Sequence, residues 1–151
     1  MIWEILHILA MFIAFGFTTG MGILMTTIVQ RGDVRTIRTA LKVARPLQIA
    51  GSIVLVVGIV FGFGAAAAVG YDLTTKWLVI AYVLAALLLI FGVGIHAAWS
   101  IRLSKAAEAS PEDHPSAELT AVLGDRLVAA AGPISGLLWI ALIAVMVLRP
   151  I

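Results

Sequence analysis

Long uninterrupted apolar runs dominate the pattern of hydrophobic and polar positions along this chain. Each run contains no Asp, Glu, Lys or Arg, and each is as long as the roughly 20 residues that a helix needs to cross about 30 Å of hydrocarbon. The pattern predicts four membrane-spanning helices, at residues 5–29, 47–70, 77–101 and 127–148. Because the runs do not alternate, a membrane β-barrel is excluded. We expect a single all-α domain over residues 1–151, a four-helix membrane bundle.

Composition supports this environment. The chain is 62% hydrophobic and 12% charged, with a mean hydropathy of +1.13, whereas soluble domains are about half apolar and about a quarter charged. Too few charged residues remain to cover a surface in water, so the excess apolar surface must face lipid. The absence of cysteine excludes disulfides, thiolate metal sites and cysteine nucleophiles.

The distribution of positive charge predicts the topology. Eight of the ten Lys and Arg residues lie in or at the ends of the connections at residues 30–46 and 102–126. The positive-inside rule therefore places these connections in the cytoplasm and both termini outside, in a bacterial inner membrane. Trp3, Tyr71 and Trp77 would form an outer aromatic belt and Trp99 would mark the inner interface. Trp139 lies mid-span, so we expect it to face another helix or subunit.

The first connection carries its basic residues at helical spacing. One interpretation is a plain topology signal, and the other is a short amphipathic helix on the anionic inner leaflet. The second connection is rich in acidic residues and proline, and we expect a solvated linker that becomes helical from Ser116 onward. The basic stretch has no interleaved aromatic residues, so we expect no nucleic-acid partner.

Glycine pairs at a spacing of four let helix backbones approach closely in lipid. Three such pairs occur, and they predict packing faces on the first, second and fourth spans; chance spacing among fourteen glycines is the alternative. The pairs are Gly16 with Gly20, Gly58 with Gly62, and Gly132 with Gly136.

One face of the first helix carries soft and polar side chains. At about 100° per residue, one stripe collects His7, Met11, Ala14, Thr18, Met21 and Met25. Imidazole ligates haem iron or copper, and thioether is a second soft ligand. His7 with Met11 is therefore a candidate cofactor or metal site near the outer boundary. Two plainer interpretations stay open: His7 reaches headgroups or water beside Glu4, and the methionines serve as adaptable packing.

Two further residues are candidates by position. His96 lies near the opposite leaflet, so it cannot share one haem with His7; we expect a structural histidine bonded to a polar residue such as Thr26, Gln48 or Ser52. Lys76 opens the third span at the level of His7. It could receive a carboxylate such as a haem propionate, or snorkel and pair with Asp72.

The segments 6–10 (LHILA) and 76–78 (KWL), with a basic stretch that ends in Arg45-Pro46, resemble a family of small bacterial membrane proteins of unknown function. That family is similar to the copper-resistance protein D membrane domain and to membrane protoporphyrinogen oxidase. The resemblance implies His7 as a haem ligand and matches Lys76 to a lysine that enters a later helix. No span contains a carboxylate or an arginine, which weighs against oxidase catalysis, and only the methionine stripe offers copper ligands at several depths.

Three functional hypotheses follow. The leading one is a non-enzymatic inner-membrane protein that holds haem b, or alternatively copper, near His7. The second is a cofactor-free structural or assembly subunit of a larger complex, such as a respiratory one. The third is an enzyme of porphyrin oxidation. Four spans bury little surface among themselves, so we also expect a homo-oligomer or a partner.

Overall fold

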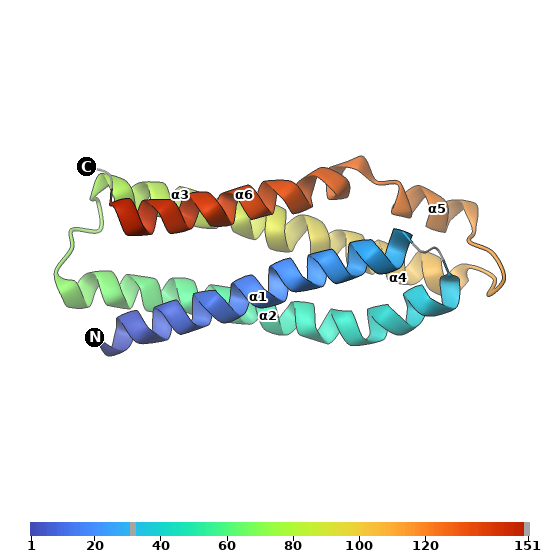
Figure 1. Ribbon diagram of the computed structural model, residues 1–151, viewed down its shortest axis with the longest axis horizontal. Helices are drawn as coiled ribbons and strands as arrows, with labels where there is room; N and C mark the ends of the chain where they lie inside the picture. The colour runs from blue at the N-terminus through green and yellow to red at the C-terminus, as the bar shows by residue number, and fades with distance from the viewer. Residues whose placement is uncertain (31–32, 150–151) are drawn as a thin grey trace.

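The computed structural model describes residues 1–30 and 33–149, and all regular structure in this range is helical (Figure 1). Four stretches of it are long and apolar enough to cross a membrane, which confirms the predicted all-α, four-span class. A seven-residue π-helical stretch, η1, joins α3 directly to α4. The elements are α1 (Ile2–Gln30), α2 (Val34–Val69), α3 (Lys76–Leu88), η1 (Leu89–Ile95), α4 (His96–Ala109), α5 (Ala117–Leu123) and α6 (Arg126–Leu148).

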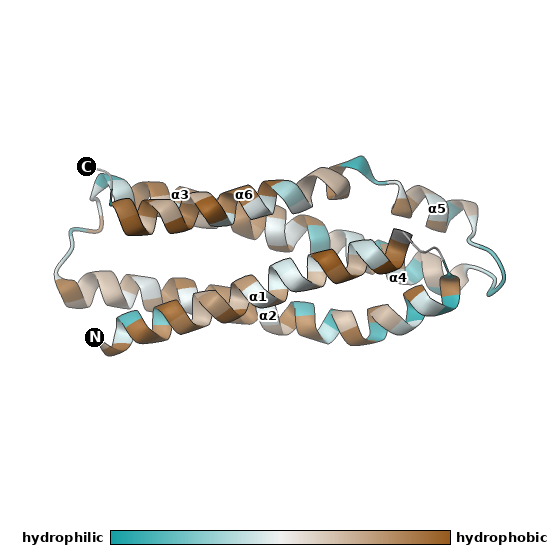
Figure 2. Ribbon diagram, in the orientation of Figure 1, coloured by the Kyte–Doolittle hydropathy of each residue, from teal (hydrophilic) through white to brown (hydrophobic). Residues whose placement is uncertain are grey.

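The helices form two pairs, α1 with α2 and α3 with α6, which lie side by side (Figure 1). The start of α1, the end of α6 and the turn at residues 70–75 lie at one end of the bundle, called here the terminal end. The start of α2, α5 and the turn at residues 110–116 lie at the opposite end, called here the basic end. Hydrophilic residues gather at the basic end, whereas the middle of the bundle is apolar (Figure 2).

Local capping chemistry sets several helix ends. The Asp33 carboxylate accepts hydrogen bonds from the backbone N–H groups of Arg35 and Thr36 at the start of α2. Ser116 and Asp125 cap α5 and α6 in the same way, as expected for residue types whose side-chain oxygen binds a free N–H. The cap at Ser116 agrees with the predicted onset of helix there.

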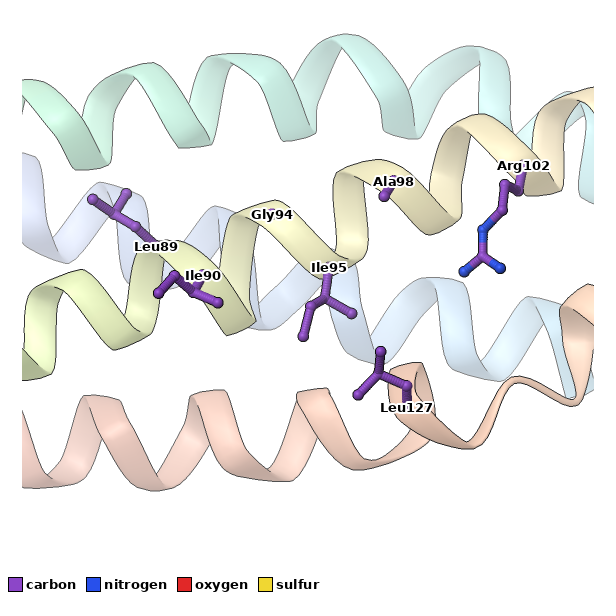
Figure 3. A pocket seen from close by; sticks show the side chains of 7 residues that line it. All are labelled: Leu89, Ile90, Gly94, Ile95, Ala98, Arg102 and Leu127. Carbon is purple, nitrogen blue, oxygen red and sulfur yellow. The ribbon is translucent and has the colours of Figure 1, made fainter.

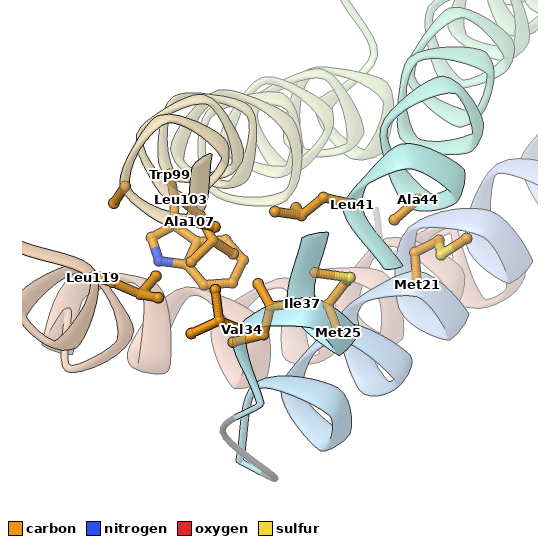
Figure 4. Packing of buried hydrophobic residues seen from close by; sticks show 11 residues of the cluster. Met21, Met25, Val34, Ile37, Leu41, Ala44, Trp99, Leu103, Ala107 and Leu119 are labelled. Atoms are coloured by element: carbon orange, nitrogen blue, oxygen red, sulfur yellow. The ribbon is translucent and has the colours of Figure 1, made fainter. Parts of the chain in front are cut away.

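The helix α2 begins earlier than predicted, so the basic stretch is its first turns rather than a loop or a separate surface helix. Val34, Ile37 and Leu41 recur every three to four residues and are buried, in a cluster with α4 and α5 residues (Figure 4). The intervening basic residues face outward, except for half-buried Arg38. The helix continues through Pro46.

Trp99 lies in the same cluster. It is 7% exposed, and its indole Nε1 donates to the Val122 carbonyl at 3.0 Å. The α5 segment folds back over the ring and supplies the acceptor that the indole needs.

Arg38 joins α2 to the end of α4 at the basic end. Its Nε donates to the Ala107 carbonyl at 2.8 Å and its Nη2 to the Ser110 carbonyl at 2.5 Å. These contacts add donors to carbonyls at the end of α4, where the regular helical hydrogen bonds run out. The Ala107 carbonyl also accepts a longer bond from the Ser110 backbone N–H, at 3.4 Å. Arg35 binds Glu112 at 2.8 Å, and this hydrogen bond, with the positive charge, lowers the pKa of Glu112.

Trp139 faces another helix, which is one of the two predicted alternatives, a helix or another subunit. It is 3% exposed and meets Phe15 of α1 edge to face, with ring centroids 5.4 Å apart. Ala14, Leu55 and Leu88 belong to the same cluster. This cluster connects the two helix pairs at the centre of the bundle.

Candidate functional site

His7 lies in the contact between α1 and α2. Its Nδ1 is 2.7 Å from the Gly58 carbonyl oxygen, and the side chain is half-buried. Because a carbonyl oxygen only accepts, the hydrogen of this bond is on Nδ1. A neutral imidazole then has its free lone pair on Nε2. Ligand histidines commonly bond a backbone carbonyl through the other ring nitrogen in this way.

Two glycines of α2 make room for this ring and for Met11. A Cβ on Gly62 would lie 2.9 Å from His7 Cε1, and a Cβ on Gly58 would lie 2.9 Å from Met11 Sδ. Both distances are shorter than real Cβ contacts, so a larger residue at either position would displace a side chain of α1. The imidazole and the thioether thus occupy successive turns of α1 against the glycine face of α2.

The remainder of the methionine stripe lies elsewhere. Met21 and Met25 are buried in the cluster at the basic end, with Ile37 and Trp99 (Figure 4). They pack against aliphatic and aromatic neighbours, which is the adaptable packing that a thioether provides.

Lys76 begins α3, in the other helix pair, and its side chain is exposed. The ion pairs of the described residues do not include a Lys76–Asp72 contact. Asp72 instead accepts the backbone N–H and the hydroxyl of Thr74, at 2.8 and 2.7 Å, and these bonds lower its pKa. Lys76 therefore shares the terminal end with His7, and no hydrogen bond within the described range joins the two.

The four remaining motif glycines have open surroundings. A Cβ on Gly16, Gly20, Gly132 or Gly136 would meet no atom of another element within 4 Å. Within one chain these faces carry no close helix contact, so their proposed packing role concerns a second copy or another subunit.

His96 has a partner that the sequence prediction did not name. Its Nδ1 is 3.0 Å from the carbonyl oxygen of Phe91, five residues earlier. Phe91 lies in η1, where the π-helical register disturbs the regular i to i−4 ladder. The expected bond to a polar residue of another span is therefore wrong, because the local helix distortion supplies the acceptor.

Sequence reasoning missed two features around the site. Gly51 forms the tightest glycine contact, since a Cβ there would lie 2.8 Å from Phe17 Cβ. At the terminal end, the Arg149 guanidinium lies over the rings of Tyr71 and Trp77, at 5.6 and 5.8 Å. Gly51 belongs to no glycine pair at a spacing of four, and only the folded chain brings Arg149 beside Tyr71.

The comparisons with known proteins identify a family but no function. No curated protein matches the chain, and no solved structure matches it. One family model, described as "Predicted integral membrane protein (DUF2269)", matches residues 1–150. With its four apolar helices, the chain therefore belongs to this family of integral membrane proteins.

Proposed function

We propose that this protein holds haem b at the terminal end of the bundle, where His7 Nε2 would bind the haem iron. The observation that carries the proposal is the 2.7 Å contact between His7 Nδ1 and the Gly58 carbonyl. That bond orients the imidazole and leaves Nε2 with a lone pair. Haem would supply one-electron chemistry, and the protein would supply its position and surroundings.

The donor set favours haem over copper. A porphyrin supplies four nitrogen ligands of its own, so one imidazole from the protein is enough to anchor its iron. A copper ion would have to take more of its ligands from the chain. His7 and Met11 offer one nitrogen and one sulfur on neighbouring turns, and Met11 Sδ faces Gly58. Lys76, exposed at the same end, is the candidate partner for a haem propionate.

An absorption spectrum of the protein purified from its own membrane tests this proposal. We expect a Soret band that is lost in His7→Ala and retained in His96→Ala, the matched control, since His96 also bonds a backbone carbonyl through Nδ1. Lys76→Ala should weaken haem retention without removing the residue that would bind the iron. A colourless wild-type protein with no bound metal, or a Soret band unaffected by His7→Ala, would refute haem ligation by His7.

A second candidate is a cofactor-free subunit of a larger membrane complex, or a homo-oligomer. The open faces at Gly16 and Gly20 on α1, and at Gly132 and Gly136 on α6, support it. Because the chain has no cysteine, a single Thr19→Cys variant reports contacts beside the α1 glycines by cross-linking in native membranes. Cross-linked dimers or a co-purifying subunit would support this candidate, and monomers alone would contradict it.

We also propose that the terminal end faces outward in a bacterial cytoplasmic membrane. The positive charge at the basic end supports this orientation. An impermeant thiol reagent applied from outside should label a cysteine at exposed Leu73 and spare one at exposed Thr39. The opposite labelling pattern would reverse the orientation.

A further inference from the structure

An open groove of about 490 Å³ runs along the outside of η1 and α4, next to the start of α6 (Figure 3). Its walls are apolar for most of their length, with Leu89 and Ile95 from η1 and Leu127 from α6. A single charged side chain, Arg102, lines it at the end nearer the turn into α5.

Small residues and the π-helix give the groove its depth. Gly94 and Ala98 line it, and an added Cβ at Gly94 would touch only the Leu89 carbonyl, at 3.6 Å. A π-helical turn is wider than an α-helical turn and displaces neighbouring side chains around the axis. The groove is therefore a feature of the helix itself.

The groove has the length of one leaflet. Leu89 is the midpoint of the apolar run at residues 77–101, and Arg102 follows its last residue. Thirteen residues at 1.5 Å each separate Leu89 from Arg102, about 20 Å. This covers half of a hydrocarbon core of about 30 Å and reaches the headgroup layer. The apolar walls then lie at acyl-chain depth and the guanidinium lies at headgroup depth.

The charged end of the groove favours an anion. Arg102 Nη2 donates to Asp125 at 2.7 Å, which leaves most of its five N–H donors for another acceptor. Lys105 is one turn further along α4, and Arg126 precedes the groove residue Leu127; both are exposed. Three cations and one carboxylate give this end a net charge of about +2.

We infer that this groove binds an anionic phospholipid, with one acyl chain along η1 and α4 and the headgroup phosphate on Arg102. The guanidinium matches phosphate oxygens with paired N–H donors. Lys105 and Arg126 favour a lipid of net negative charge over a zwitterionic one, whose ammonium group they repel. This inference does not depend on haem binding at His7.

Native mass spectrometry of the full chain in mild detergent tests the inference, with phosphatidylglycerol and phosphatidylcholine of equal chain length as probes. We expect wild-type protein to bind phosphatidylglycerol more tightly than phosphatidylcholine. Arg102→Ala should weaken phosphatidylglycerol binding about tenfold, the usual effect of losing a hydrogen-bonded charge. Arg45→Ala is the matched control, because Arg45 is an exposed cation of α2 that does not line the groove. This variant should leave phosphatidylglycerol binding unchanged.

A groove-filling variant tests the acyl-chain contact separately. Ala98 is exposed, so Ala98→Leu should fold normally and reduce phosphatidylglycerol binding even though every charge is retained. Circular dichroism melting of each variant verifies the fold. Equal affinity for the two lipids, or an Arg102→Ala effect no larger than that of Arg45→Ala, would overturn the inference. Undiminished binding by a folded Ala98→Leu variant would overturn the placement of the acyl chain.

Discussion

The glycine that faces His7 gives the sharpest test of the site geometry. In Gly62→Ala, the new Cβ would lie 2.9 Å from His7 Cε1, whereas carbon atoms pack favourably at about 3.5–4.0 Å. The overlap of about 0.6–1.1 Å is relieved in one of two ways. Either the ring moves and loses its hydrogen bond to Gly58, which costs about 0.5–1.5 kcal/mol of stability, or the helices separate, which costs about 1–3 kcal/mol.

The matched control is the same substitution at Gly16, where an added Cβ meets no other element. Both variants gain the helix propensity of alanine, about 1 kcal/mol at most, so their difference isolates the tertiary cost. We expect Gly62→Ala to be less stable than Gly16→Ala by about 1–3 kcal/mol. Unfolding in mixed micelles measures this difference, and ¹⁵N NMR of the His7 imidazole reports the lost hydrogen bond. Equal stability with an unchanged imidazole spectrum would refute the geometry.

Three further predictions concern other contacts. Gly51→Ala should destabilise the protein by about 1–3 kcal/mol in the same unfolding assay, because Phe17 Cβ lies 2.8 Å from the added atom and is fixed to its backbone; stability equal to wild type would contradict this contact. Arg38→Ala should remove the guanidinium donors from carbonyls at the end of α4, so amide exchange at residues 107–110 should accelerate, and unchanged exchange would argue against the cap. The hydrogen bond from Arg102 lowers the pKa of Asp125 in the folded protein. The ionised Asp125 carboxylate therefore stabilises the fold fully above about pH 4, and this stabilisation is lost as the pH falls through the lowered pKa. Melting temperature should fall with acidification below about pH 4, and Asp125→Asn should flatten this dependence, whereas an identical acid profile in that variant would exclude the Arg102 pair as a cause.

The candidate site was predictable in its residue types and not in its contacts. The stripe that contains His7 and Met11 follows from helical periodicity alone, and Gly58 and Gly62 follow from their spacing of four. Their direct juxtaposition did not follow, because it depends on the register between α1 and α2. The same limit applies to Gly51, which only the approach of Phe17 singles out.

The basic end shows a different limit. The sequence marked its positive charge, but it did not reveal that Val34 and Ile37 form the buried face of a longer α2. Nor did the sequence pattern predict the π-helical stretch at Leu89–Ile95. Here the partners are α4 and α5, more than sixty residues away along the chain.

By itself, the sequence determined the membrane environment, the number of spans and the all-α class, because these depend on the length and polarity of continuous segments. Only the tertiary structure decided which helix faces meet, which carbonyl binds His7, and where a groove opens beside Arg102. The physical reason is that lipid is as apolar as the side chains of the helices. The lipid-facing and inward-facing sides of a spanning helix are therefore similarly apolar, and the sequence pattern does not distinguish them. Close packing and a few hydrogen bonds select the arrangement.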